Sequence, residues 1–167
     1  MLIATAAALL VASPALAAKP TRTVIQQTGT VTIPAGFGCA FDVVAHLQPG
    51  ARITFTEFSD GRLAYHEHAN AILTNADTGA TLYHRARFSG VDVYDDATGL
   101  VSSVTQGRVN VFFYPGDDGP FGTVAEPGAI YRFVGRISYL YDADTEAISD
   151  FSYSGSVTDV CAELSEP

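Results

Sequence analysis

Apolar and polar residues alternate with a period of two along most of this chain, and this pattern restricts the fold more than any other feature. In residues 108–114, Val109, Val111 and Phe113 fall on one side, and residues 131–141 alternate in the same way. Successive side chains of a β-strand point to opposite faces, so this period is typical of strands with one buried face. We find no convincing 3.6-residue stripe of an amphipathic helix beyond the N-terminal leader. The sequence therefore predicts an all-β protein.

Short segments rich in Gly, Asp, Asn and Pro separate the expected strands at regular intervals. These residues supply the positive φ values that tight hairpin turns need. About nine or ten strands joined in this way form an antiparallel meander, which closes into a β-barrel or packs as a two-sheet β-sandwich. The pattern does not choose between the two. The expected strands cover residues 22–33, 41–47, 52–56, 63–74, 80–88, 90–95, 100–106, 108–114, 131–141 and 147–160.

One irregular segment is much longer than the other connections. Residues 115–128 contain three prolines and several glycines, which exclude both a helix and a central strand. Long loops on compact β scaffolds often carry function. We therefore predict that this segment is a lid or a binding loop.

The only two cysteines, Cys39 and Cys161, are expected to form a disulfide. The bond would close a loop of roughly 120 residues, for which chain entropy predicts a stabilisation of about 4–5 kcal/mol. The alternative is a pair of buried free thiols. Neither cysteine has a base beside it in the sequence, so both alternatives make the cysteines structural.

The N-terminus has the features of an export signal. Residues 2–12 form a short apolar run, and Ala15 and Ala17 fit the small-residue cleavage pattern that follows such a run. Pro14 ends the run well short of the roughly 20 residues that a membrane-spanning helix needs. We therefore predict a signal peptide over residues 1–18 and a secreted single domain over residues 19–167, without membrane insertion.

The charge balance is strongly acidic. Asp and Glu number 18 against 9 Lys and Arg, which gives a net charge of −9. A negative net charge repels phosphate backbones and anionic lipid head groups. Nucleic acids and membrane surfaces are therefore not expected as partners.

Four features together resemble small secreted proteins of actinobacteria that have no assigned activity. They span roughly residues 36–161 and include a Gly-Cys-Ala-Phe-Asp-Val motif at residues 38–43, a turn at residues 74–79, a Gly-rich strand pair, and a Gly-to-Cys stretch at residues 155–161. The resemblance implies export and a β fold. It implies no catalytic residue.

The clearest chemical pattern is the His-x-His pair at His66 and His68. On a strand both imidazoles and Asn70 would share one face, which is a spacing by which β proteins present ligands to Zn²⁺. A third ligand would have to come from elsewhere, and the candidates are His46, His84, Asp42 or an acidic loop. The simpler interpretation is two solvent-facing histidines, so we predict no metal site and no cofactor.

Two further acidic features were considered as sites. Glu57 falls on the same face as Ile53 and Phe55, where burial would raise its pKa and suit it to acid–base chemistry. The alternative is that the strand end turns Glu57 outward. The acidic turns at residues 95–96 and 117–119 could bind Ca²⁺ but lack the spaced ligands of an EF-hand loop, so solvated turns are preferred.

Motifs of known enzyme classes are missing from the sequence. There is no G-x-S-x-G, S-x-x-K or H-E-x-x-H pattern and no phosphate-binding Gly loop. The preferred function is non-enzymatic binding of a small apolar ligand or a protein partner. The alternatives are a metal-dependent enzyme that uses His66 and His68, and a structural component of the cell envelope or surface.

Overall fold

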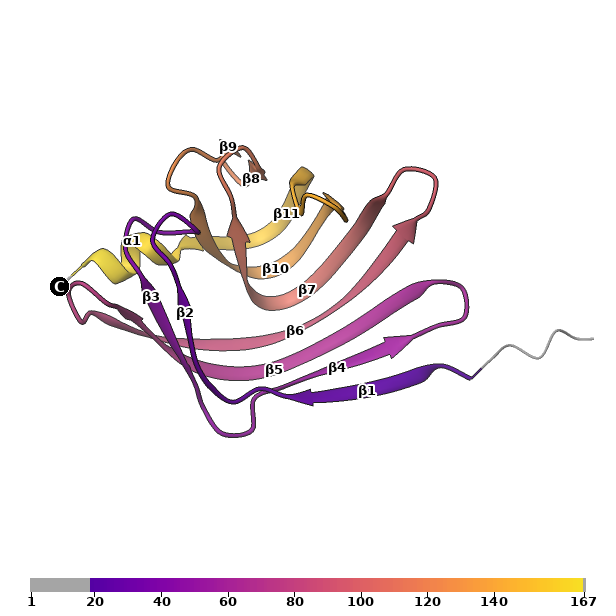
Figure 1. The fold of residues 1–167 in the computed structure, drawn as a ribbon, viewed down its shortest axis with the longest axis horizontal. Coiled ribbons are helices and arrows are strands. Elements are labelled where there is room, and N and C mark those ends of the chain that lie inside the picture. The colour runs from indigo at the N-terminus through magenta and orange to yellow at the C-terminus, as the bar shows by residue number, and fades with distance from the viewer. Residues whose placement is uncertain (1–18, 167) are drawn as a thin grey trace, which may run out of the picture.

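The structure is a computed structural model that describes residues 19–166, and the predicted signal peptide lies outside them (Figure 1). Within residues 19–166, nine antiparallel strands form one sheet, and two very short strands form a separate hairpin. The prediction of an antiparallel all-β fold is confirmed. The elements are β1 (Thr21–Gln26), β2 (Gly29–Ile33), β3 (Val43–Leu47), β4 (Arg52–Glu57), β5 (Arg62–Asn75), β6 (Thr81–Asp95), β7 (Leu100–Phe113), β8 (Asp118–Gly119), β9 (Gly122–Thr123), β10 (Ala129–Asp142), β11 (Ile148–Asp159) and α1 (Val160–Ser165).

The main sheet is a meander with a divided first edge. From β4 onward the order is β4-β5-β6-β7-β10-β11. Both β3 and β4 pair with the same edge of β5, β4 with residues 63–68 and β3 with residues 71–75. Strands β1 and β2 then extend the sheet by pairing with β4 and β3. The single strand predicted over residues 22–33 is therefore interrupted, and Gln27 at the break donates its backbone N–H to the carbonyl of Ala51.

The sheet stays open, so the closure into a barrel considered above does not occur. Within the described residues, no ladder joins β1 to β11. Instead β5 and β6 run as long bowed strands, while one arm of β7 and of β10 rises away from them (Figure 1). Residues of β3 and β5 pack against Ile130 of β10, so two parts of one bent sheet face each other in the manner of a sandwich.

Three glycines on neighbouring strands produce the bend. Gly107 of β7 faces Gly135 of β10, which faces Gly155 of β11. All three have positive φ, at 129°, 147° and 120°. Such values exclude most side chains, and a Cβ atom at any of the three would overlap a neighbouring backbone carbonyl oxygen. Gly107 was expected in a turn between two strands, but here it lies inside one continuous strand.

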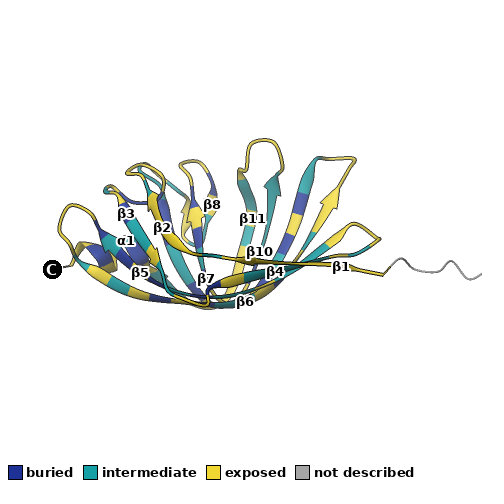
Figure 2. Cartoon of the chain, turned by 60° about the horizontal axis from the view of Figure 1, so that its bottom comes forward, coloured by how far each residue is buried: buried dark blue, intermediate teal, exposed yellow. Residues whose placement is uncertain are grey.

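Apolar side chains fill both sides of the bent part. On one side of β7 and β10, the Phe113 and Phe133 rings pack against the Phe151 ring. The ring centroid of Phe151 lies 5.1 Å from that of Phe113 and 5.3 Å from that of Phe133. On the other side, Ile130 joins a cluster with Val43, Leu73 and the helix residues Val160 and Leu164. Alternating bands of burial along the strands reflect this two-sided arrangement (Figure 2).

The disulfide between Cys39 and Cys161 is confirmed, with Cα atoms 5.5 Å apart. Cys39 lies in the loop before β3, and Cys161 lies in α1 rather than in a strand. Helix α1 begins where the last strand was expected to end, because Asp159 accepts a hydrogen bond from the N–H of Ala162 as an N-cap. No helix in the described part of the chain has the length and apolar character needed to span a bilayer.

Candidate ligand pocket

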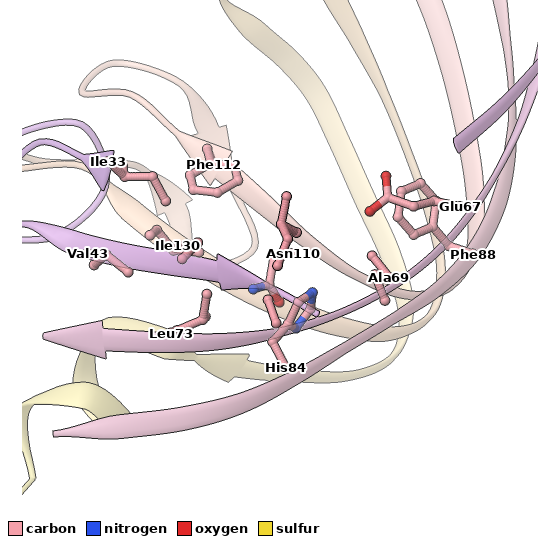
Figure 3. Close-up of a pocket in the computed structure, with 14 residues that line it drawn as sticks. Ile33, Val43, Glu67, Ala69, Leu73, His84, Phe88, Asn110, Phe112 and Ile130 are labelled. Atoms are coloured by element: carbon pink, nitrogen blue, oxygen red, sulfur yellow. The ribbon is translucent and has the colours of Figure 1, made fainter. Parts of the chain in front are cut away.

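A pocket of about 240 Å³ lies between the two facing parts of the sheet (Figure 3). Its walls come from six strands, and most of its surface is apolar. Inward-facing residues of β5 and β6 form one wall, and residues of β7 and β10 face them. The lining residues are Ile33, Val43, Ala45, Leu47, Glu67, Ala69, Ala71, Leu73, His84, Ala86, Phe88, Asn110, Phe112 and Ile130.

Small side chains create the space. Ala69 and Ala86 stand opposite each other in the β5–β6 ladder, and Ala71 stands opposite His84. All three alanines are almost fully buried. A larger side chain at these inward positions would fill the pocket, so the alanines keep it open.

His84 is the most strongly perturbed polar group of the lining. Only 9% of its surface is exposed. Burial lowers the pKa of its imidazole to about 4, and the positive charges of Arg132 and Arg108 contribute in the same direction. The ring is therefore neutral at pH 7, with one nitrogen as donor and the other as acceptor. Its Nδ1 atom is buried and has no hydrogen-bond partner in the protein.

Asn110 is the second polar group with an unsatisfied atom. Its Oδ1 is buried and likewise receives no hydrogen bond. A buried polar atom without a partner costs roughly 1–3 kcal/mol. Two such atoms in one apolar pocket are therefore an expensive feature of the folded chain, and a ligand that bonded to both would recover part of that cost.

Glu67 lies at the end of the pocket next to Phe88, its cross-strand neighbour (Figure 3). Burial raises the pKa of its carboxyl. The polar groups of the pocket are thus a neutral imidazole, an amide and a carboxyl with increased affinity for its proton.

A second and more open pocket of about 410 Å³ lies around Tyr65 of β5, Asp92 of β6 and Tyr139 of β10. The Tyr65 hydroxyl lies 2.7 Å from Thr105 Oγ1 and 3.1 Å from Ser103 Oγ. Its ring covers Gly90, where a Cβ atom would overlap it. Burial raises the pKa of Tyr65 to about 12, so this phenol stays protonated and acts as a packing and hydrogen-bonding group.

The structure separates the residues considered for a metal site. His66 and His68 share the outer face of β5 with Asn70, as alternation predicts. His84 faces the pocket, whereas His46 lies on β3 with its Nδ1 3.0 Å from Thr30 Oγ1. Asp42 accepts a hydrogen bond from the N–H of Ala35. Within residues 19–166, no three His, Cys, Asp or Glu side chains converge in a way that could hold a metal ion.

The acidic candidates have local structural roles. Glu57 ends β4 and is exposed. Asp95 accepts a hydrogen bond from the N–H of Ala97 in its turn. Asp117 differs from the expected solvated turn because it is buried, with Oδ2 2.7 Å from the Tyr114 N–H nitrogen and Oδ1 2.8 Å from that of Ile148.

Asp117 thereby attaches the long segment of residues 115–128 to the start of β11. This segment contains the β8–β9 hairpin and contributes Val124 to the core beside Phe113. None of its residues lines the pocket of about 240 Å³ between the two facing parts of the sheet. Its prediction as a lid or binding loop therefore does not extend to this pocket.

The sequence reasoning missed Asn110 and Glu67. Alternation assigned Asn110 to the solvent side of its strand, but the bend at Gly107 turns that side toward β5 and β6. Glu67 could have been noticed, because it interrupts an inward series that contains Tyr65 and Ala69. Closely spaced alanines at inward positions of two adjacent strands were a further indication of a cavity.

No family model, curated protein or solved structure gives a significant match to this chain.

Proposed function

We propose that this chain is an exported, non-enzymatic binding protein that holds a small apolar molecule carrying one hydroxyl group. The observation that carries the proposal is the pair of buried, unpartnered atoms, His84 Nδ1 and Asn110 Oδ1, in a mostly apolar pocket that has the Glu67 carboxyl at one end. Pockets of this kind, with an apolar lining and a few polar groups, are typical of small-molecule sites.

A hydroxyl group fits the two free atoms better than other single groups. Asn110 Oδ1 only accepts hydrogen bonds, so the ligand must offer a donor to it. A hydroxyl can donate to Oδ1 and, with its lone pairs, accept from a protonated Nδ1 of neutral His84. A carboxylate has no hydrogen to donate and would leave Asn110 unpaired.

The size of the pocket limits the ligand. An apolar cavity of about 150 Å³ can hold benzene. The present pocket of about 240 Å³ therefore suits a molecule of about ten non-hydrogen atoms, such as a short alkylphenol or a branched alcohol. Export is supported by the leader sequence, and the disulfide agrees with an oxidising compartment.

The test compares 4-propylphenol with propylbenzene, which has the same shape without the hydroxyl. Isothermal titration calorimetry on the chain without its leader should give at least tenfold tighter binding for the phenol. In Asn110→Leu the two molecules should bind equally, and in Ala86→Leu neither should bind. Equal affinity for both molecules in the wild-type protein, or binding that survives Ala86→Leu, would contradict the proposal.

A further inference from the structure

The outer face of the sheet carries a concentration of positive charge that the net charge of −9 conceals. Alternation and register place a cluster of arginine and histidine side chains together on this face, away from the pocket. They come from β4, β5, β6 and β10, and β7 lies between β6 and β10 in the sheet. We call them the outer basic face, formed by Arg52, His66, His68, Arg85, Arg87 and Arg136.

Three of these residues form a row across the strands. Arg52 faces His68, and His68 faces Arg87. Adjacent strands are about 4.8 Å apart. Arg87 in turn faces Arg108 of β7. Like charges directly opposite each other destabilise a sheet, so this pair of arginines is unfavourable for folding alone. The pKa of His68 is lowered first by desolvation and then by Arg87, Arg52, His66 and Arg85, in agreement with close packing of these groups.

The next row supplies mainly hydroxyl, amide and imidazole groups that form hydrogen bonds, together with Arg136. Its members follow one another across six strands, and His66 Nδ1 lies 3.0 Å from Ser89 Oγ within it. Hydroxyl and amide groups of this kind bond to uncharged hydroxyls as readily as to anions. The row consists of Thr54, His66, Ser89, Gln106, Arg136 and Ser154.

Among the described residues, none of the arginines of this face forms an ion pair. Ion pairs in the described part of the chain are Arg62 with Asp60 and Arg132 with Glu163, and neither lies in these rows. Arg52 and Arg85 are exposed. Arg87 uses one guanidinium nitrogen to donate to the carbonyls of Ala69 and Ala86, which holds its side chain in place.

Two shallow hollows lie on this face, one formed by β1, β4 and β5 and the other by β6, β7 and β10. The first has a volume of about 340 Å³ and is lined by Arg22, Thr54 and His66 among others. The second has a volume of about 490 Å³ and is lined by Ser89, Gln106 and Arg136 among others. Each hollow therefore combines one guanidinium with hydroxyl or amide groups.

We propose that the outer basic face binds an anionic polysaccharide, with arginines pairing its carboxylate or sulfate groups and the hydroxyl and amide side chains of the second row bonding its hydroxyls. Guanidinium groups pair such anions through two parallel hydrogen bonds. The proposal concerns a different face from the pocket and does not require the pocket to be filled.

A polysaccharide fits this face better than a nucleic acid. The two rows contain no Phe, Tyr or Trp side chain on which bases could stack, although stacking is a major part of single-strand binding. A long duplex would extend beyond the arginines toward the acidic remainder of the molecule, which repels phosphates. A flexible chain with fewer charges per unit length can be bound locally.

The experiment measures binding of oligogalacturonate, a carboxylated sugar polymer, by isothermal titration calorimetry at low salt. Neutral dextran of similar length is the control ligand. The test variant Arg52→Gln/Arg85→Gln removes two exposed charges from the face. The control variant Lys19→Gln/Arg62→Gln removes two charges outside the two rows, and Arg62 is already paired with Asp60. Circular dichroism and melting temperature confirm that each variant is folded.

We expect the wild-type protein to bind oligogalacturonate, to bind it more weakly as salt is added, and not to bind dextran. The test variant should lose at least tenfold in affinity, and the control variant should stay within twofold. Three results would each overturn the proposal: no binding by the wild-type protein, equal losses in both variants, or tighter binding of a DNA duplex than of oligogalacturonate. Binding of 4-propylphenol should be unchanged in the test variant, so a failure of the polysaccharide proposal can be distinguished from a failure of the proposed ligand binding in the pocket.

Discussion

Gly107 and Gly135 face each other across the β7–β10 ladder, both with positive φ, and the sheet bends where they meet. Because neither residue has a Cβ atom, the two backbones can approach closely, and β7 and β10 bend together away from β5 and β6 (Figure 1). The bend directs Phe113 toward one side of the strand and Asn110 toward the pocket on the other. The shape of the pocket therefore depends on these two glycines.

Gly135→Ala should destabilise the protein by about 2–3 kcal/mol or more. The new Cβ would overlap the carbonyl oxygen of Ser154, and alanine does not readily adopt a φ of 147°. Urea unfolding monitored by circular dichroism measures the change. Gly99→Ala is the matched control, because Gly99 also has positive φ but open space around it, and should cost about 1 kcal/mol. Equal losses in both variants would show that the crowding at Gly135 is unimportant.

The same bend explains how far the sequence could predict this structure. Alternation in Val109, Val111 and Phe113 correctly indicated a strand. It could not distinguish a glycine in a turn from Gly107 in a bend, because both need positive φ and only the opposing Gly135 shows the difference. The burial of Asn110 in the pocket could not be predicted from the sequence for the same reason, because it depends on contacts made across the bend.

Reduction of the disulfide between Cys39 and Cys161 should lower the free energy of unfolding by about 4–5 kcal/mol. The bond closes a loop with a sequence separation of 122 residues, and its main effect is to restrict the unfolded chain. Urea unfolding with and without a reductant measures the difference. A change below about 1 kcal/mol would indicate that the unfolded chain is restricted by other means.

Asp117→Ala should destabilise the protein by about 2–3 kcal/mol. The carboxylate is 3% exposed and accepts hydrogen bonds from the backbone of Tyr114 and Ile148, so its loss leaves two N–H groups unpaired. Asp95→Ala removes a similar but exposed turn bond and should cost less than about 1 kcal/mol. Thermal unfolding of both variants makes the comparison, and a larger loss in Asp95→Ala would refute the structural role of Asp117.

Replacing His66 and His68 together by alanine should change stability by no more than about 0.5 kcal/mol. Both side chains lie on the outer face, and the one hydrogen bond involved, from His66 to Ser89, is exposed. Added Zn²⁺ should not raise the melting temperature of the wild-type protein, because two ligands on one strand do not complete a zinc site. A stoichiometric metal that disappears in the double variant would make the metal-dependent enzyme the leading hypothesis in place of non-enzymatic binding.

The buried imidazole of His84 should make stability fall as the pH is lowered from about 6.5 to about 4. Its pKa in the folded protein is about 4, below the value of 6.5 for an unperturbed histidine, so the unfolded chain takes up the proton first. The contribution of His84 is therefore fully present above pH 6.5 and is lost progressively toward pH 4, by up to about 3 kcal/mol.

His84→Gln provides the reference for this effect, because glutamine keeps a polar side chain but does not titrate. Other groups, including Glu67 with its raised pKa, titrate in both proteins and cancel in the difference. Urea unfolding of both proteins at pH 7, 5.5 and 4 should show the advantage of the wild type shrinking at each step. A difference that stays constant over this range would mean that His84 keeps an ordinary pKa. In that case the imidazole would be charged in mild acid, and the neutral donor–acceptor pair proposed for the ligand hydroxyl would exist only near neutral pH.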